Sequence, residues 1–486
     1  MYIMFENILN GDTYKSLVNG KWIASNSNNT IEIHSPVDKS LVGKIQAFSK
    51  DDVDTIIENS KQAQKSWGST PINERAEVLY KVAALLDENV ETISKIMQKE
   101  IAKDSKSATS EVKRTVDFIN FTASEGNHVE GETIGADSFP GFKKNKISFV
   151  TRIPLGTVLA ISPFNYPVNL SASKIAPALI AGNSVILKPP TQGAISALYL
   201  AEIFNQAGLP AGLLNVITGR GSEIGDYIVT HKDINFINFT GSSEVGRHIS
   251  KISEMVPLLL ELGGKDAAIV LKDADLELAA NNIVSGAFGY SGQRCTAVKR
   301  VLVIDNIADE LVDLINNKVQ KLKVGKPEDG VDITPLINDK AANFVQELID
   351  DAIVQGAKLV IGNKREGNLI YPTLLDNVTT NMRLAWEEPF GPVLPIIRIK
   401  DMDEGIKIAN ESEYGLQSAV FTENIDDAFY VAQKLEVGAV QINNKTERGP
   451  DHFPFLGVKS SGMGTQGIRY SIEAMSRPKA IVLNLK

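Results

Sequence analysis

Short apolar runs alternate with amphipathic helical patterns from Thr157 onward, and this alternation is the strongest constraint on the fold. In the first series we expect strands at 158–162, 184–188, 213–218 and 235–239, with helices at 174–181, 193–206 and 223–230. A second series follows Glu261, with expected strands at 267–271 and 300–304 and a helix at 307–322. Such repeats predict parallel, doubly wound sheets that bind ligands at the carboxyl ends of their strands.

The segments outside these series are of two kinds. Near the start we expect a hairpin around 18–22 and helices at 52–67 and 72–97. Two extended stretches, 146–153 and 479–485, stand apart from every helical pattern. We expect both stretches to be β-strands whose unpaired edges must hydrogen-bond to another strand.

Composition and charge exclude several classes of protein. The 486 residues, 43% hydrophobic and 22% charged, are ordinary for a globular chain of about two to four domains. A net charge of −9 argues against a nucleic-acid or anionic-membrane surface. No apolar run approaches the ~20 residues of a membrane span, and residues 1–21 lack a signal-peptide pattern. We therefore expect a cytoplasmic protein that binds no nucleic acid, membrane or metal.

The chain has one cysteine, Cys295, within Gly-Tyr-Ser-Gly-Gln-Arg-Cys-Thr at 289–296. A lone cysteine is commonly an inert buried thiol, and the alternative is that it acts as a nucleophile. The flanking residues favour the nucleophile. Glycines let a ligand approach closely, and we expect the neighbouring Arg294 to favour the reactive thiolate.

A thiol nucleophile needs partners, and the five histidines lie in no protease-like context. Glu261 ends the apolar run 258–260, where an acid is unfavourable unless it is paired or its pKa is raised. A glutamate bonded only to backbone amides is the alternative. Asn165 follows an expected strand between two prolines, which suits a preorganised donor for an oxyanion.

Five motifs together resemble the aldehyde dehydrogenase superfamily, in that family's order. They are Pro-Phe-Asn at 163–165, Glu-Leu-Gly-Gly-Lys at 261–265, Gly-Gln-Arg-Cys at 292–295, Glu-Pro-Phe-Gly-Pro at 388–392 and Phe-Pro-Phe-Leu-Gly at 453–457. The resemblance implies Cys295 as nucleophile, Glu261 as general base, and Asn165 with the Cys295 amide as oxyanion hole. It also implies that Glu388 holds the nicotinamide ribose and that Phe390 packs near the nicotinamide ring.

The same resemblance implies a domain organisation. We expect an α/β fold with two doubly wound Rossmann-type domains and a small β flap for oligomerisation. The cofactor domain would comprise 1–137 and 158–262, the catalytic domain 263–455, and the flap 138–157 and 456–486. In this family the flap reaches another subunit, which implies a homotetramer built as a dimer of dimers.

Two glycine turns compete for the cofactor's pyrophosphate. The turn at 219–225 resembles a dinucleotide fingerprint with its spacing off by one, and it reads better as an ordinary βα turn. The turn at 239–246 follows an expected strand, opens a helix and matches the family's cofactor turn. We therefore assign the pyrophosphate to Gly241, Ser242 and Gly246. The remaining expected cofactor contacts are Ser162, Lys188, Thr191, Asp226, Leu262, Glu388 and Phe390.

Thr191 bears on the choice of cofactor. Many relatives that use NAD place a glutamate here, which bonds the adenosine ribose and would repel a 2′-phosphate. A threonine hydroxyl beside Lys188 accepts that phosphate, so NADP is expected. The alternative is that Lys188 bonds a ribose hydroxyl in either cofactor and Thr191 caps a helix that begins there.

Arginines near the motifs predict an anionic substrate. Arg114, Arg294 and Arg448 look like those of the non-phosphorylating glyceraldehyde-3-phosphate dehydrogenases, where such residues hold the substrate phosphate. Guanidinium groups suit a dianion, although each arginine alone could serve in a surface ion pair. The expected substrate contacts are Arg114, Asn165, Tyr166, Arg294, Thr296 and Arg448.

The sequence therefore predicts NADP-dependent, irreversible oxidation of D-glyceraldehyde 3-phosphate to 3-phosphoglycerate without inorganic phosphate. The route would pass through a thiohemiacetal and a thioester on Cys295, with Glu261 activating the hydrolytic water. One alternative is an NADP-linked dehydrogenase of another small anionic aldehyde, such as succinate semialdehyde. Another is a non-catalytic protein that keeps the fold, against which the intact set of Asn165, Glu261 and Cys295 argues.

Overall fold

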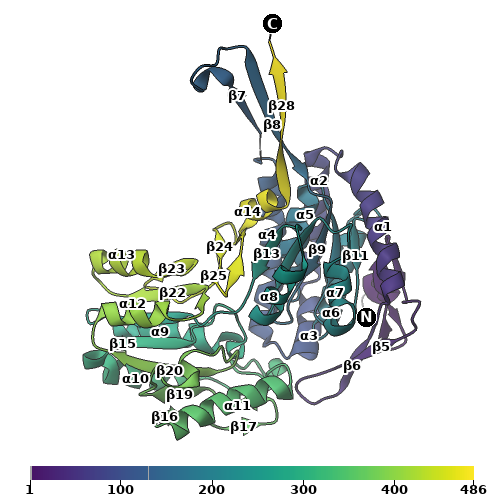
Figure 1. Cartoon of the computed structure of the whole chain (residues 1–486). Coiled ribbons are helices and arrows are strands. Elements are labelled where there is room, and N and C mark those ends of the chain that lie inside the picture. Colours follow the sequence, from purple (N-terminus) through teal and green to yellow (C-terminus); the bar gives the residue numbers. More distant parts are fainter. Residues whose placement is uncertain (1–2, 130, 486) are drawn as a thin grey trace.

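The computed structural model describes residues 3–129 and 131–485 and contains two large sheets with a projecting flap (Figure 1). The strands of the first sheet, in spatial order, are β11 (Leu214–Val216), β10 (Ser184–Lys188), β9 (Thr157–Ile161), β12 (Phe236–Thr240), β13 (Leu258–Glu261) and β26 (Gly462–Met463). All neighbours are parallel except β26, which pairs antiparallel with β13. Each strand expected in this series is present.

The helices around this sheet are α1 (Lys50–Trp67), α2 (Ile72–Glu88), α3 (Val90–Ile101), α4 (Ser105–Gly126), α5 (Asn169–Ile180), α6 (Ala194–Gln206), α7 (Gly221–Val229), α8 (Ser243–Ile252) and α14 (Ile468–Ala474). The single helix expected at 72–97 is wrong, because the chain divides into α2 and α3 at Asn89. The Asn89 side chain donates 2.7 Å to the Leu85 carbonyl. An asparagine that bonds nearby backbone competes with helix continuation.

The second sheet contains β16 (Lys358–Ile361), β19 (Thr373–Asp376), β20 (Val393–Ile399), β15 (Arg300–Ile304), β14 (Ala267–Val270), β22 (Gln417–Phe421) and β23 (Ala439–Ile442). Its helices are α9 (Leu276–Phe288), α10 (Asp305–Val319), α11 (Asp339–Val354), α12 (Met402–Asn410) and α13 (Ile425–Lys434). Only the edge strand β16 runs antiparallel to its neighbour. Both strands expected here are present as β14 and β15, and the expected helix is α10.

The remaining strands form small sheets near the surface. They are β1 (Leu9–Asn10), β2 (Thr13–Tyr14), β5 (Thr30–His34) and β6 (Leu41–Gln46), with the hairpin β3 (Ser16–Val18) and β4 (Lys21–Ile23). Three further pairs are β17 (Arg365–Glu366) with β18 (Leu369–Ile370), β21 (Tyr414–Gly415) with β25 (Val458–Lys459), and β24 (Phe455–Leu456) with β27 (Thr465–Gln466). The hairpin confirms the one expected around 18–22.

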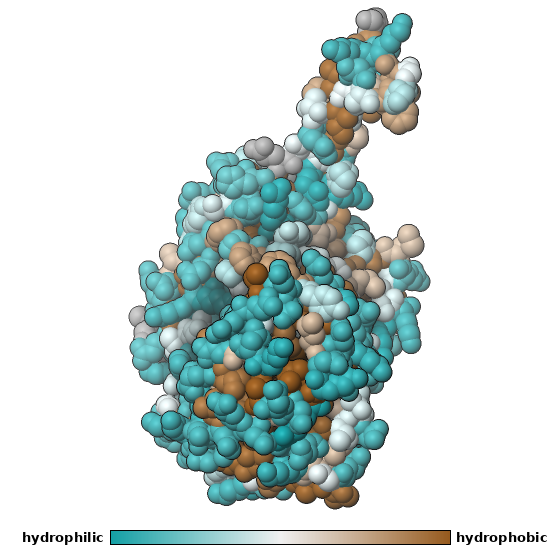
Figure 2. All heavy atoms as spheres, turned by 90° about the vertical axis from the view of Figure 1, so that its left-hand side faces the viewer, coloured by the Kyte–Doolittle hydropathy of each residue, from teal (hydrophilic) through white to brown (hydrophobic). Residues whose placement is uncertain are grey.

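The flap is a three-stranded sheet of β7 (Glu132–Gly135), β8 (Lys146–Pro154) and β28 (Ser476–Asn484), and it projects from the body with apolar side chains on its surface (Figure 2). Phe149 and Ile481 are 43% and 58% exposed. Both extended segments expected from the sequence are therefore strands. Within 456–486, however, β26 joins the first sheet, and β7 adds a flap strand before residue 138.

A left-handed turn between α9 and β15 presents Cys295. Tyr290, Ser291 and Gly292 have φ of +50°, +53° and +71°, which is strained for the two residues that carry side chains. The Ser291 hydroxyl donates to the Thr334 carbonyl and accepts from the Thr334 amide, each at 2.9 Å. A Cβ on Gly292 would lie 2.3 Å from the Gly391 carbonyl oxygen, so glycine is required there.

We expect Gly292→Ala to lower the free energy of unfolding by about 1–3 kcal/mol, because it adds both a left-handed strain and a backbone collision. Urea unfolding of the full chain measures the change. Gly289→Ala is the matched control, because φ there is −55° and an added Cβ would meet Arg294 at an ordinary 3.7 Å. Equal stability of both variants would show that the turn tolerates a side chain at 292.

Candidate active site

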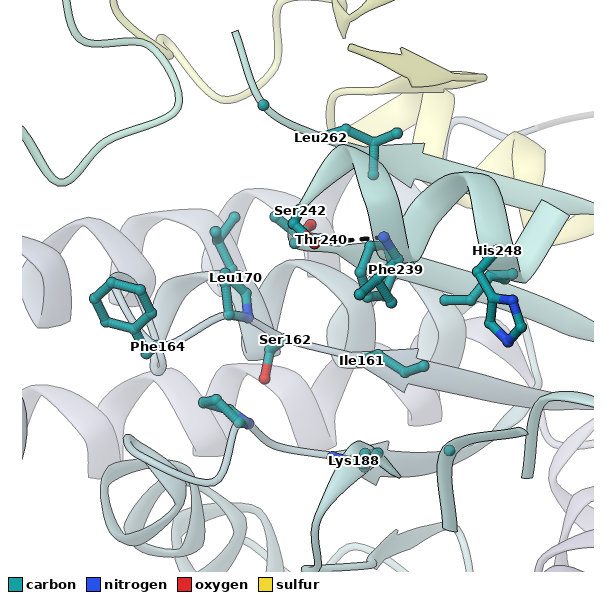
Figure 3. Close-up of a pocket in the computed structure, with 18 of the residues that line it drawn as sticks. Ile161, Ser162, Phe164, Leu170, Lys188, Phe239, Thr240, Ser242, His248 and Leu262 are labelled. Carbon is teal, nitrogen blue, oxygen red and sulfur yellow. Dashed lines mark hydrogen bonds between the residues drawn. The ribbon is translucent and has the colours of Figure 1, made fainter. Parts of the chain in front are cut away.

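A cavity of about 730 Å³ lies at the carboxyl ends of β9, β10 and β12 (Figure 3). Ile161, Lys188 and Phe239 lie on these neighbouring strands, and their side chains surround the cavity with Leu262. Its predicted cofactor residues are Ser162, Lys188, Asp226, Gly241, Ser242, Leu262, Glu388 and Phe390, and its predicted catalytic residues are Asn165 and Cys295. Residues up to 229 positions apart in the 486-residue chain therefore share one cavity at the sheet edge expected for ligands.

One end of the cavity is formed by the starts of α7 and α8. Both glycine turns contribute, since Gly221 and Gly241 line the same space. Gly246 does not line it. A Cβ at Gly246 would lie 2.4 Å from Leu262, so this glycine allows α8 to pack closely under that side chain. Asp226 also lines the cavity, with its carboxylate 2.9 Å from the imidazole of His248.

Lys188 is a buried cation without an acidic partner among the described residues. Its Nζ donates 3.4 Å to the Pro189 carbonyl, and burial lowers the pKa of its ammonium to about 8. Thr191 is not among the lining residues and does not cap α6, which begins after Gly193. The alternative reading of Thr191 as a helix cap is therefore wrong.

The first amides of α6 are instead bonded to a carboxylate from another helix. Glu100 of α3 accepts from the amides of Gly193, Ile195 and Ser196 at 2.8–3.0 Å. Such amides would otherwise offer an anion site. These amides are therefore not free to bind an anion, whereas the Lys188 ammonium lines the cavity.

At the other end of the cavity, Asn165 is held beside the nucleophile. Its Nδ2 donates 2.9 Å to the Gln293 carbonyl, two residues before Cys295. Its own carbonyl accepts 2.7 Å from Lys103, whose ammonium also lies 3.5 Å from the ring centre of Tyr166. The position of Asn165 is therefore fixed at both its side chain and its backbone.

The surroundings of Cys295 disfavour the thiolate. Removal of the thiol from water raises its pKa to about 12, and the nearby Glu261 carboxylate acts in the same direction, while Lys299 acts against them. Arg294 points elsewhere and donates to the Gly286 carbonyl. The expectation that Arg294 favours the thiolate is thus wrong, because adjacency along the chain does not bring its guanidinium to the sulfur.

Glu261 is buried in a polar network at the end of β13. Its carboxylate accepts from Nη1 of Arg448 at 3.1 and 3.2 Å and from the Thr240 hydroxyl at 2.9 Å. Lys174 donates 2.7 Å to that hydroxyl, and burial lowers the pKa of its ammonium to about 7. The alternative of a glutamate bonded only to backbone amides is therefore wrong.

Asp451 joins two of the predicted substrate arginines. Its carboxylate lies 3.4 Å from Nε of Arg448 and accepts from Nε and Nη2 of Arg114 at 2.6 and 2.7 Å. No hydrogen bond with a described residue involves Nη2 of Arg448 or Nη1 of Arg114. Arg294 is not part of this group, and the carbonyl of Thr296 accepts from the Thr446 hydroxyl at 3.0 Å.

Glu388 and Phe390 also line the cavity. The Glu388 carboxylate is ion-paired with Lys299 at 2.8 Å. Phe390 has a left-handed φ of +50° and an edge-to-face contact with Phe164, with ring centres 5.9 Å apart. A bulky residue in that backbone region indicates a position fixed by its surroundings.

Sequence reasoning missed several residues that hold this site. Lys174 was detectable as a lone charge in the apolar stretch of α5, and Asp451 as an acid three residues after Arg448. Thr240 and Lys103 gave no such signal, because their contacts come from distant segments.

Comparison with known proteins agrees with this arrangement. The profile of the aldehyde dehydrogenase family matches residues 22–481. An NADP-dependent glyceraldehyde-3-phosphate dehydrogenase from Streptococcus equinus is 59% identical and covers 97% of this chain and 99% of its own length, and one from Pisum sativum is 52% identical, covering 98% and 97%. The structure of such an enzyme from Bacillus halodurans C-125, complexed with NADP, superposes with a TM-score of 0.96 at 55% identity, covering 97% of this chain and 99% of that one. The expected α/β fold is thereby confirmed, and the chain belongs to the aldehyde dehydrogenase family.

Proposed function

We propose that this enzyme oxidises D-glyceraldehyde 3-phosphate to 3-phosphoglycerate with NADP and without inorganic phosphate. The observation that carries the proposal is the Arg448–Asp451–Arg114 cluster, which adjoins Glu261 and so lies beside the proposed chemistry. The names of the Streptococcus and Pisum relatives support the same reaction.

In the proposed chemistry, the sulfur of Cys295 bonds to the aldehyde carbon, the thiol proton passes to solvent, and the C=O bonding pair moves onto the oxygen. The resulting oxyanion is stabilised by the amide of Asn165 and the backbone N–H of Cys295. NADP, when bound, supplies the acceptor for the hydride that leaves the aldehyde carbon. Glu261 then takes a proton from water as the hydroxide adds to the thioester carbon. The C–S bond breaks to release the acid, and the proton held by Glu261 passes to the sulfur to restore the thiol.

The residues around the cavity fit NADP. Lys188 is a buried ammonium with only a carbonyl partner, and a 2′-phosphate would give it a counter-ion. Thr191 is uncharged at the position where a glutamate would repel that phosphate. The amides at the start of α8, beside Gly241 and Ser242, suit the pyrophosphate. Ser162, Asp226 and Leu262 would contact the nucleotide elsewhere, and Gly246 would act through packing.

The phosphate of the substrate is assigned to the free edges of Arg114 and Arg448. Asp451 orients both guanidinium groups, and each retains one Nη group without a hydrogen bond to a described residue. Bidentate guanidinium contacts suit a dianion. Tyr166 and Thr296 are proposed as further contacts. Arg294 is also proposed, through its Nε, which has no hydrogen-bond partner among the described residues, because its Nη2 is bonded to the Gly286 carbonyl.

We also propose assembly into a tetramer through the flap, with the domain boundaries expected from the sequence changed so that β7 belongs to the flap and β26 to the first sheet. Support comes from the exposed apolar side chains of β8 and β28.

Within 3–129 and 131–485, no helix has the length and apolarity needed to cross a membrane. A cytoplasmic location accords with a single cysteine.

NADP reduction by the purified enzyme, followed by absorbance over a panel of aldehydes, tests the proposal. D-glyceraldehyde 3-phosphate should be preferred over glyceraldehyde and succinate semialdehyde, with equal rates in the presence and absence of inorganic phosphate. Preference for succinate semialdehyde would assign the arginines to a carboxylate. Dependence on inorganic phosphate would overturn the hydrolytic route.

Glu261→Gln should separate the two half-reactions, because acylation of Cys295 needs no hydrolytic base whereas deacylation does. Rapid mixing should give a burst of about one NADPH per active site followed by very slow turnover. Cys295→Ser is the control and should give no burst. Loss of the burst in Glu261→Gln would assign the glutamate to the first half-reaction.

Thr191→Glu should weaken NADP use by about 100-fold or more, because like charges in contact cost several kcal/mol. NAD lacks the 2′-phosphate and serves as the internal control. The measurement is kcat/KM for each cofactor at saturating aldehyde. An unchanged ratio of the two values would place the 2′-phosphate away from residue 191.

Arg114→Ala should raise KM for D-glyceraldehyde 3-phosphate roughly 10- to 150-fold, the equivalent of a charge-assisted hydrogen bond. Unphosphorylated glyceraldehyde should be affected little. Arg448→Ala should also lower kcat for both aldehydes, because Arg448 contacts Glu261 directly. Arg448 is therefore a less specific test of phosphate binding than the sequence suggests. If Arg114→Ala penalises both aldehydes equally, the phosphate assignment falls.

A further inference from the structure

Lys299 lies between two of the residues proposed to carry the reaction. It is four positions after Cys295, and its side chain is 2% exposed. Its ammonium donates to the Cys295 carbonyl and pairs with Oε1 of Glu388 at 2.8 Å. One buried cation thus touches both the residue that bears the nucleophile and the carboxylate assigned to the nicotinamide ribose.

The backbone around Lys299 is packed so closely that this contact has little freedom. The Gly264 amide donates 3.1 Å to the same Oε1 of Glu388. A Cβ on Gly263 would lie 2.3 Å from Oε2 of Glu388, and a Cβ on Gly264 would lie 3.2 Å from the Cys295 carbonyl oxygen. Three chain segments therefore meet around one ammonium group.

We propose that Lys299 is a positioning residue. Through its ion pair with Glu388, it would hold the nicotinamide ribose at a fixed position relative to Cys295. The inference rests on the proposed function, because it assigns Glu388 to the ribose and Cys295 to the aldehyde. Hydride transfer depends on the placement of the donor carbon against the acceptor, and a misplacement of about 1 Å can cost about 100-fold in rate. A shift of Glu388 away from Cys295 would break one of the two bonds that Lys299 makes.

A purely structural role is the competing explanation, since Lys299 could simply neutralise buried acids. Its amide donates 3.0 Å to the Asp266 carbonyl, so its backbone is anchored independently of its ammonium. Lys265 provides the comparison. It is also buried in this region, and its Nζ has no hydrogen-bond partner in the described part of the chain.

The test compares Lys299→Met with Lys265→Met in the full-length enzyme. The readouts are the rate of the NADPH burst, the Kd of NADP and the rate of alkylation of Cys295 by iodoacetamide. Lys299→Met should slow the burst about 10- to 100-fold with little change in Kd, because the adenosine half of NADP keeps its contacts. Alkylation should also slow, because Lys299 acts to lower the pKa of the Cys295 thiol. Lys265→Met should change none of these readouts.

A double-mutant cycle with Glu388→Gln keeps the inference falsifiable if Lys299→Met alone folds poorly. The double variant leaves no unpaired charge at this contact, and its loss in burst rate should be much smaller than the product of the separate losses. If Lys299→Met folds poorly, the double variant is compared with Glu388→Gln alone. A further loss in burst rate of about 10-fold or more then overturns the inference.

A wild-type burst rate in Lys299→Met also overturns the inference, as does an equal loss of burst rate in Lys265→Met. Absence of a burst in the wild-type enzyme with D-glyceraldehyde 3-phosphate would instead reject the proposed substrate, and the comparison would then use whichever aldehyde the enzyme oxidises.

Discussion

The ion pair between Glu261 and Arg448 links the two halves of the site. Glu261 ends a strand of the first sheet, whereas Arg448 lies in the loop after the last strand of the second. Both side chains are at most 10% exposed, so either partner alone would be a desolvated charge. The pair therefore restricts the position of the loop over the strand end, and the loop in turn places Asp451 against Arg114 of α4.

This network also shapes the chemistry that the site can perform. Arg448 contacts the proposed base and, through Asp451, the arginine proposed for the substrate phosphate. Occupation by a dianion would change the charge next to Glu261 in the same event that places the aldehyde. In the proposed mechanism, substrate recognition and activation of water are thus electrically connected rather than separate functions of separate residues.

The elements of the fold were largely predictable because they depend on local pattern. Buried parallel strands read as apolar runs, and β10 was predicted from end to end. The break at Asn89 was missed because a side-chain bond to Leu85 overrides a continuous helical pattern. The order of the five motifs, compared with that of the family, was enough to predict that Cys295 and Asn165 lie in one cavity. Side-chain direction was not predictable, and Arg294 shows this, since it adjoins Cys295 in sequence yet bonds the carbonyl of Gly286.

The carboxylate of Glu100 makes the anchoring of the start of α6 independent of the side chain at residue 191. Without it, the helix start and the local charge would both depend on the same turn. By bonding the first amides of α6, Glu100 holds the backbone that follows Thr191 without using the side chain at 191. Substitution at this position can therefore alter the local charge while the helix start stays anchored. In evolutionary terms, the charge at position 191 could differ between lineages by a single codon change while Glu100 keeps the start of α6 anchored.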